Sequence, residues 1–361
     1  MHGAAMSVHT GESLTFVMVT DSNIDELGPG LSNLHQAVHG VNHDPAYWRW
    51  RHLDNPTGKA NTCVAVKAGE VVGNFSSIYL ELVVEGKRVM AALNADLAVH
   101  PSERSWECLR GLLEMNMSKS LEDRVPFGFG FSTPLAEEIN ELLDGNNLGP
   151  APMYLGFLNA VNLLKGRSVP RAFSFIGKLA QPIVGLKVQN GDASAFDIRR
   201  VEGFGSEFDE LWGAIQDNRS VAVIKDARYL NWRYLERPFA RYGRLAAYRE
   251  DKLEGLAVFY VGERRNAFFL ELLARDDSPV TMRALLQRAF EELRMQGAGF
   301  IWASFPAHSE AASVLKELGF KSWGRRFWNM YMTVTTDRGK ESCPELDAKS
   351  WDLSLGDWLL Q

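Results

Sequence analysis

The sequence predicts an α/β fold, with mixed α+β sheets, arranged as two tandem domains of similar structure. Three observations predict it. The chain has 361 residues, which is more than a single hydrophobic core holds comfortably. Strand-like alternation and helical periodicity follow each other along the chain. The segment YWRWRHLDNP, which ends at Pro56, resembles YLNWRYLERP, which ends at Pro238, and the two lie 182 positions apart.

The internal repeat continues downstream of these segments. Further anchors follow in the same order, at separations that decrease from 182 to 170, as expected if the second copy has shorter loops: Gly73 with Gly255, Pro134 with Pro306, and Leu148-Gly149 with Leu318-Gly319. We therefore expect a first domain over 1–165, a linker over 166–192 that is rich in Gly, Pro and basic residues, a second domain over 193–335, and a C-terminal extension over 336–361.

The elements of the first half are expected in the order β, αα, βββ, α, β, α, β. The turn Glu85-Gly86 joins two of these strands as a hairpin. The predicted strands are 14–19, 62–67, 71–82, 87–99 and 127–132, with further strands through Tyr154 and Phe157, and the predicted helices are 23–39, 45–53, 102–120 and 135–143.

The second half is expected to repeat this order. Ser278 is predicted to cap a helix that has Pro279 at its first position and stops at Gly297. The other predicted elements are strands 196–200, 244–249, 252–261, 267–274 and 299–304, helices 207–215 and 229–235, and a helix that ends at Leu318-Gly319. An aromatic tail over 323–332 is predicted to close a sheet, and 351–360 to pack back as a cover or as a homodimer contact.

Composition excludes several classes of protein. Hydrophobic residues at 46% and charged residues at 23% are typical of globular proteins. The net charge is −6 without a dense basic stripe, which argues against a nucleic-acid partner, and Arg325 and Arg326 are too few for one. Three widely spaced cysteines predict neither disulfides nor a metal site. The chain has no leader-like start and no long apolar stretch, so we expect a cytoplasmic protein without a membrane partner.

Two segments carry a family resemblance. HSEAASVLKELGF, from His308 to Phe320, resembles a helix-and-strand signature of the GNAT acyltransferase superfamily. LAVHPSERSWECLRGLL, from Leu97 to Leu113, resembles the leading strand and acyl-CoA loop of that family. Together with the repeat, the resemblance covers nearly the whole chain, which as a whole resembles tandem GNAT proteins.

The resemblance implies acetyl-CoA or another acyl-CoA as co-substrate, and no metal. In the family, backbone N–H groups of the loop bind pyrophosphate at the positive end of the following helix. The strand before the loop splays from its neighbour and binds the pantetheine arm like an added strand. A carboxylate or water relay deprotonates the amine, and a Tyr commonly protonates the thiolate. The residues that the resemblance places at the cofactor are Leu97, Ala98, Val99, Arg104, Ser105, Trp106, Glu107, Cys108 and Leu109.

The first loop departs from the family pattern. Arg104 matches its basic position, but Ser105, Glu107 and Leu109 stand where glycines are usual. A carboxylate ~4 Å from a phosphate costs on the order of 4 kcal/mol, whereas the helix terminus returns only about 0.3–1 kcal/mol. Glu107 must therefore point away, or the loop does not bind pyrophosphate in the family manner. The alternative is that Glu107 simply caps its own helix.

The second loop departs further. The turn from Arg275 to Pro279 contains Asp276 and Asp277, and its Pro removes an N–H donor. Leu315 stands where the family commonly has the Tyr that protonates the thiolate. We therefore interpret this half as a structural or substrate-shaping copy.

Candidate catalytic residues lie around the end of strand 87–99. Asp96 or His100 can act as general base to an amine, and Ser132 and Thr133 end the neighbouring strand, where we expect substrate. For each, a structural role is the alternative. Cys108 has no paired His and is expected to be a buried thiol rather than a nucleophile.

The repeated Trp-Arg motif has an architectural and a functional interpretation. Trp50 and Trp232 are expected to bury against the sheet, and Arg51 and Arg233 to pair with a carboxylate or a helix end. Similar motifs lie near the acceptor entrance of tandem relatives, so Arg51 is also a candidate substrate-binding residue.

Three functions are compatible with the sequence. The first is an acyl-CoA-dependent N-acyltransferase that binds its cofactor in the first half and transfers acetyl to a small amine or amino sugar in a cleft between the halves. The second is a catalytically silent tandem GNAT protein that binds a ligand or partner. The third is a Fem-type aminoacyl transferase, against which the net charge of −6 argues.

Overall fold

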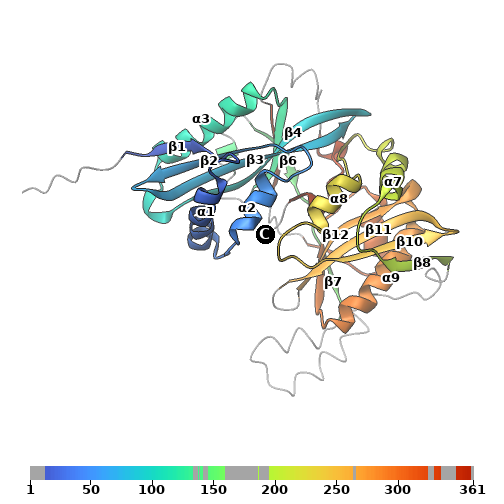
Figure 1. The fold of residues 1–361 in the computed structure, drawn as a ribbon. Helices are drawn as coiled ribbons and strands as arrows, with labels where there is room; N and C mark the ends of the chain where they lie inside the picture. Colours follow the sequence, from blue (N-terminus) through green and yellow to red (C-terminus); the bar gives the residue numbers. More distant parts are fainter. Residues whose placement is uncertain are drawn as a thin grey trace, which may run out of the picture. The chain divides into compact units, whose positions relative to one another are not determined.

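The computed structural model describes residues 13–132, 137, 139–140, 145–158, 186, 195–262, 266–323, 329–334 and 347–358. The chain divides into two compact units. Unit 1 comprises Met1–Tyr79 and Asn94–Arg124, and unit 2 comprises Leu80–Leu93 and Val125–Gln361. Figure 1 shows the elements with the labels used below.

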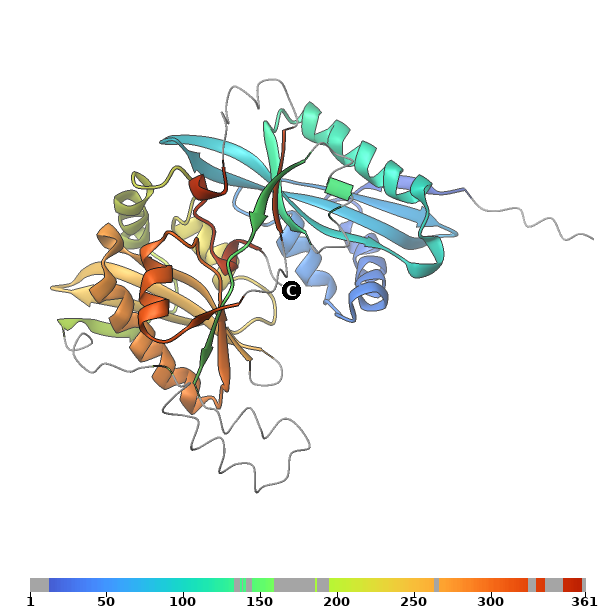
Figure 2. The same cartoon turned by 180° about the vertical axis from the view of Figure 1, so that it is seen from behind.

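Unit 1 has a sheet with helices on both faces. Its helices and strands are β1 (Thr15–Met18), α1 (Ile24–His39), α2 (Pro45–His52), β2 (Ala60–Lys67), the first part of β3 (Glu70–Val84), the last part of β4 (Lys87–Val99), the short turn η1 (Pro101–Glu103) and α3 (Trp106–Glu122). Neighbouring strands β1, β2 and β3 are antiparallel. Alternate residues of β2 point to opposite faces: Asn61 donates to Asn116 O of α3, whereas Thr62 bonds His52 of α2. Thus α3 covers one face and α1 and α2 the other (Figures 1 and 2).

Local sequence signals explain the ends of the helices in unit 1. Asp44 caps α2 by accepting from the Ala46 N–H at 2.9 Å, and Pro45 occupies the first helical position. Gly40 ends α1 in the left-handed conformation, with φ 71°. The indole N–H of Trp48 donates to Ser32 Oγ at 2.9 Å, which fixes α2 against α1.

Unit 2 contains a complete mixed sheet and the strands that flank it. Its strands are β5 (Phe127–Ser132), β6 (Asn146–Pro150), β7 (Tyr154–Phe157), β8 (Asp197–Arg200), β9 (Val221–Val223), β10 (Gly243–Arg249), β11 (Lys252–Val261), β12 (Asn266–Ala274), β13 (Phe300–Ala303), β14 (Lys321–Ser322) and β15 (Asn329–Val334). Its helical elements are α7 (Ser206–Gln216), α8 (Ala227–Tyr234), η5 (Arg275–Asp277), α9 (Pro279–Met295), α10 (Glu310–Glu317), η6 (Ala348–Ser350) and η7 (Leu355–Trp358).

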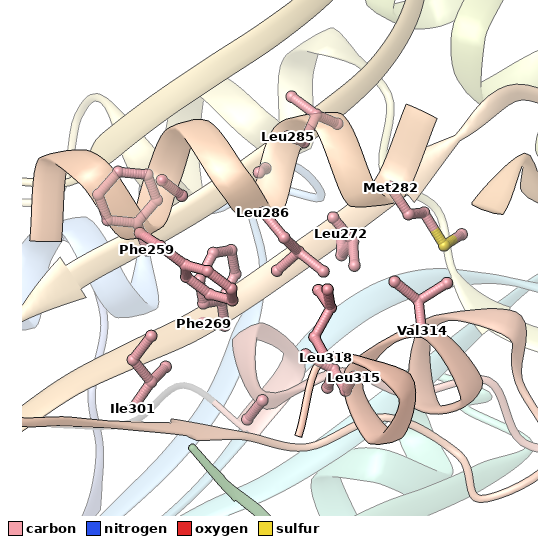
Figure 3. Close-up of a cluster of buried hydrophobic side chains, with 14 of the residues drawn as sticks. Phe259, Phe269, Leu272, Met282, Leu285, Leu286, Ile301, Val314, Leu315 and Leu318 are labelled. Atoms are coloured by element: carbon pink, nitrogen blue, oxygen red, sulfur yellow. The ribbon is translucent and has the colours of Figure 1, made fainter. Parts of the chain in front are cut away.

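The strand order of the complete sheet is β14-β7-β13-β12-β11-β10-β8. Only β12 and β13 are parallel, as a crossover through α9 requires. One face packs on α9 and α10 in a core that Figure 3 shows, with Phe259, Phe269, Leu286 and Leu315 fully buried. The opposite face carries Glu271, which accepts a hydrogen bond from Tyr234 of α8.

The two halves of the sequence exchange their last strands. Strand β7 precedes the predicted linker, yet it pairs with β13 and β14 of the second half. Strand β15 belongs to the second half, yet it pairs with β5 and β6 of the first. Because the exchanged strands tie β5 and β6 to the later part of the chain, the compact units do not follow the boundaries 1–165 and 193–335. Those boundaries, with 166–192 and 336–361, stay predictions.

The repeated glycines have matching environments. A Cβ at Gly73 would lie 3.1 Å from Cys108 Sγ and 3.0 Å from Leu112 of α3. At Gly255, a Cβ would lie 2.8 Å from Thr281 and 3.1 Å from Leu285 of α9. The absence of a side chain at these glycines therefore lets α3 approach the sheet in the first half and α9 approach it in the second. This shared packing explains why glycine recurs at both positions of the repeat.

The predicted mixed α/β fold is confirmed, and most predicted helices and strands of the described residues are present. One helix begins later than predicted: 102–120 is in fact η1 followed by α3 from Trp106. The reason is that Ser105, rather than Ser102, is the residue whose Oγ accepts the N–H of Cys108. The short strands β6 and β9 were not predicted. The helix 135–143 lies mostly, and the linker 166–192 almost entirely, outside the described residues.

Candidate functional site

The turn between β4 and α3 is the candidate cofactor site. His100 caps η1, because its Nδ1 accepts from the Ser102 N–H at 3.4 Å and lies 2.8 Å from Ser102 Oγ. Ser105 caps α3 by accepting from the Cys108 N–H at 3.2 Å. The N–H groups of Trp106 and Glu107 precede the first intrahelical bond, which runs from Leu109 N–H to Ser105 O. The positive end of a helix of 17 residues is thus exposed at this turn.

The side chains at the turn point to solvent. Trp106 is 57% exposed, and Arg104, Ser105 and Glu107 are exposed as well. Neither Trp106 nor Glu107 is buried against the N-terminus of α3. The Arg104 guanidinium forms no ion pair with any residue of the described parts of the chain. It is therefore available to an anionic ligand.

Three other residues assigned to the cofactor are half-buried or buried in the strand. Leu97 and Val99 are half-buried, and Ala98 is buried, as expected where one edge of a strand supports a ligand. Leu109 lies half-buried one turn into α3. Among these residues only the Ala98 side chain is fully packed in the core, and the side chains of Leu97, Val99 and Leu109 stay partly accessible.

Cys108 is a buried thiol without nucleophilic character. Its side chain is fully buried, and burial raises the pKa of the thiol, as do the nearby charges of Glu103 and Glu107. A raised pKa keeps sulfur protonated and unreactive at neutral pH. The interpretation of Cys108 as a packing residue is consistent with this environment.

Asp96 and Arg51 form a buried ion pair. The Arg51 guanidinium donates to both carboxylate oxygens, at 2.6 and 2.9 Å, and each side chain is only 2% exposed. Burial alone raises the pKa of Asp96, but the charges of Arg51, His35 and His52 lower it by more, so that the carboxyl pKa lies below its ordinary value. Asp96 also has φ 57° inside β4. A carboxylate held ionised in this way is a weak proton acceptor.

Histidines surround this ion pair on the side of α1 and α2. His35 lies against Asn74 Oδ1 at 3.0 Å, and His52 bonds Thr62 Oγ1 at 2.9 Å and stacks on Trp48. Burial lowers the pKa of His52 to about 3. Both imidazoles are packed side chains of the core. Within the described residues, no group of three or more His, Cys, Asp or Glu side chains is arranged to hold a metal ion.

His100 and the ends of neighbouring strands are placed differently. His100 is half-buried and lines a cavity of about 790 Å³ together with Ser102, Glu103 and Lys67. Lys67 forms an ion pair with Glu103 at 2.8 Å. Ser132 is buried and bonded by Asn140, and Thr133 lies outside the described residues. His100 and Asp96 stand four positions apart on an extended strand, which separates them by ~13 Å, so they do not form one catalytic pair.

The corresponding turn of the second half is closed by its own side chains. Asp277 pairs with Arg219 through both guanidinium nitrogens, and Ser278 caps α9 by accepting from Thr281 N–H at 3.3 Å. Pro279 supplies no N–H. These contacts agree with the prediction that this turn offers little to a phosphate.

A buried charge cluster in unit 2 was missed from the sequence. Lys225 Nζ donates to Glu271 at 2.6 Å and to Asp357 at 3.0 Å, and all three side chains are buried. A signal existed: Glu271 and Asp96 each lie three residues before the end of their strand, at Ala274 and Val99. The repeat therefore places a buried carboxylate at the same point of both halves.

Part of the chain matches a known protein family. Residues 25–138 match the family model described as an acetyltransferase (GNAT) domain. This region belongs to the GNAT superfamily. The matched region contains α1, α2, the Arg51–Asp96 pair and the β4–α3 turn, so the resemblance seen in the sequence is confirmed where the candidate cofactor site lies. No match to a curated protein sequence was found.

Solved structures share the fold over most of the chain. A probable N-acyltransferase from Enterococcus faecalis has a TM-score of 0.62 at 10% identity and covers 91% of this chain and 74% of its own. A GCN5-related N-acetyltransferase from Anabaena variabilis gives 0.62 at 12%, covering 90% and 73%. Saccharomyces cerevisiae N-myristoyltransferase with bound myristoyl-CoA gives 0.64 at 13%, covering 92% and 81%. The chain thus shares the fold of these solved structures over about nine tenths of its length. Among the described residues, no helix combines the length and apolar character needed to cross a membrane.

Proposed function

We propose that the protein is an acyl-CoA-dependent N-acyltransferase that binds acetyl-CoA in its first half and transfers the acetyl group to a small amine. The observation that carries the proposal is the exposed β4–α3 turn within the region that matches the GNAT family model. The structural neighbours, one of which holds bound myristoyl-CoA, support an acyl-CoA as the co-substrate. The tandem arrangement, with boundaries near 165 and 193, belongs to the same proposal.

Binding of the pyrophosphate would use groups that are free to meet it. The N–H groups of Trp106 and Glu107 have no partner within the helix, and the guanidinium of Arg104 adds a full charge. Because the Glu107 carboxylate is exposed, it can turn into water, which keeps it beyond the ~4 Å at which repulsion is on the order of 4 kcal/mol. Ser105 Oγ caps the helix as an acceptor, so its O–H can still donate a hydrogen bond to a phosphate oxygen.

The surroundings of Asp96 and of His100 support different roles for the two candidate proton acceptors. Asp96 is bonded to Arg51 through both oxygens, so its role would be to position the strand and α2 rather than to take a proton. Arg51, equally buried, would support the same arrangement and leave the substrate to other groups. His100 borders the cavity of about 790 Å³, a volume typical of small-ligand sites, and is the candidate general base.

A second candidate function is a silent GNAT protein that binds a ligand without transferring a group. Glu107 in the first turn of α3 and the closed turn at Asp277 favour it. The two candidates differ in whether acetyl-CoA binding leads to release of free coenzyme A in the presence of amines.

Thermal unfolding with and without millimolar acetyl-CoA tests the proposal. A ligand at ~100 times its dissociation constant stabilises the native state by about 2.7 kcal/mol, which at roughly 2–4 °C per kcal/mol for domains of this size raises the Tm by about 5–11 °C. The shift should fall to about half or less in Arg104→Ala, whose dissociation constant is expected to be about 10- to 100-fold higher. The matched control is Arg110→Ala, an exposed arginine on the same helix that pairs with Glu114. An unchanged Tm in the wild type, or equal shifts in both variants, contradicts the proposed function.

A further inference from the structure

The C-terminal segment 351–358 is seated inside unit 2 (Figure 2). Trp351 forms a parallel β-bridge with Val221, whose carbonyl accepts the Asp352 N–H at 2.7 Å. The Leu355 N–H donates to Ser304 O at 3.0 Å. Leu355 and Asp357 are buried almost completely. The segment is therefore part of the folded structure and not a surface tail.

The segment lies where two parallel strands part. Strands β12 and β13 pair only as far as Phe269 and Ala303, although β12 continues to Ala274. Beyond the last pair, backbone groups on the facing edges have no ladder partner and need another one. Ser304 directly follows β13, and its carbonyl is satisfied by Leu355. The segment thus binds to the strand edge as an added peptide does.

A buried charge cluster holds the segment in this place. Lys225 donates to Glu271 on β12 and to Asp357 in the segment, and also to Ser354 Oγ at 2.9 Å. The Ser354 hydroxyl in turn donates to Glu271 at 2.8 Å. Displacement of the segment would break the hydrogen bonds of Lys225 to Asp357 and Ser354 and that of Ser354 to Glu271, so the cluster favours the seated segment.

Gly356 shows how closely the segment fits. A Cβ at this position would lie 2.0 Å from Tyr234 Oη and 2.4 Å from Glu271 Oε1. The Gly356 carbonyl accepts from Arg233 Nε at 3.2 Å. Any side chain at residue 356 would therefore displace the segment or the groups beneath it. Arg233, the arginine of the second Trp-Arg motif, thus helps to hold the segment through this hydrogen bond.

We propose that residues 351–358 are an internal ligand of the second half, seated between its fourth and fifth strands where an acyl-CoA arm would otherwise bind, so that each chain binds one acyl-CoA and not two. The number of acyl-CoA molecules rests on the proposed function. The seating of the segment rests only on the contacts around Ser304, Glu271 and Gly356.

Two glycine variants of the full chain test the proposal. Gly356→Ala introduces the clashing methyl group, and Gly213→Ala in α7 is the matched control, because a Cβ there meets nothing within 4 Å. Hydrogen exchange of the Leu355 amide measures the seating. Equilibrium dialysis with labelled acetyl-CoA measures the number of molecules bound per chain.

We expect slow exchange at Leu355 in the wild type and in Gly213→Ala, and exchange at least ~10-fold faster in Gly356→Ala. We expect one acetyl-CoA per chain in all three proteins, which also shows that both variants keep the first site. Exchange in the wild type at the rate of an unfolded peptide, or equally slow exchange in Gly356→Ala, overturns the seating. Two molecules per chain in the wild type or in Gly213→Ala overturn the closed second site. If the wild type binds no acetyl-CoA, the proposed function is contradicted. In that case the exchange rate of the Leu355 amide alone decides whether the segment is seated.

Discussion

The role of Asp96 can be decided by one substitution. Asp96→Asn keeps the size of the side chain and removes the carboxylate charge that faces the Arg51 guanidinium, which is buried at 2% exposure. Breaking a buried pair in this way costs about 3–5 kcal/mol. If Asp96 served instead as a free general base, the same substitution would abolish transfer and leave the free energy of unfolding almost unchanged.

The stability that is lost with the Arg51–Asp96 ion pair can be separated from the general effect of removing a charge. Arg51→Met combined with Asp96→Asn removes both charges, so the double variant should lose less stability than the two single variants together. Asp25→Asn is the surface control, because Asp25 is 85% exposed in its pair with Arg49 and such pairs are worth about 0–1 kcal/mol.

Urea unfolding, followed by tryptophan fluorescence, is the assay. Trp48 and Trp50 are buried in α2 beside Arg51, so their emission reports on this part of unit 1. Loss of less than about 1 kcal/mol in Asp96→Asn, or additive losses in the double variant, would refute the assignment of Asp96 as a structural partner of Arg51.

Two further predictions concern titratable groups of unit 1. Burial lowers the pKa of His52 from 6.5 to about 3. Between these two pH values the imidazole is therefore protonated in the unfolded chain and neutral in the folded chain. Stability should therefore fall as the pH falls from 6.5 towards 3, by about 2 kcal/mol at pH 5, and His52→Gln should remove that part of the pH dependence in urea titrations. An equal dependence in wild type and variant contradicts this. Burial and the charges of Glu103 and Glu107 raise the pKa of Cys108, so iodoacetamide should modify it at least ~10-fold more slowly in the native than in the urea-unfolded protein. Equal rates by mass spectrometry would show an accessible thiolate instead.

Much of the fold could be predicted because local signals and tertiary packing agree. Pro45 after Asp44, Pro279 after Ser278, and the turn at Glu85-Gly86 each set an end of a helix or strand that the structure retains. Where two signals competed, the sequence misled: both Ser102 and Ser105 can cap a helix, and only the hydrogen bond to the Cys108 N–H decides between them.

The strand exchange could not be predicted from the sequence. Strands β7 and β15 are short and are buried in succession, without an alternating pattern that would fix a partner, so the sequence alone does not say which sheet each one joins. The same holds for the C-terminal segment. Its burial was expected, but its contact with Ser304 depends on distant residues that meet only in the folded chain.

The candidate site was predicted in part. The resemblance located the turn at Arg104 and Glu107, and the structure shows that both side chains are exposed there. The bond between Asp96 and Arg51 was not predicted, because a buried ion pair between residues 45 positions apart leaves no local pattern. The repeat itself was the best available signal, since it aligns Asp96 with Glu271.

Calorimetric titration with acetyl-CoA tests most directly the claim that the β4–α3 turn of the first half holds the cofactor. The account predicts saturable binding by the wild type and by Arg110→Ala, and a dissociation constant about 10- to 100-fold higher for Arg104→Ala, because a hydrogen bond to a charged group contributes about 1.5–3 kcal/mol. No heat of binding in the wild type, or equal affinity in both arginine variants, would contradict it.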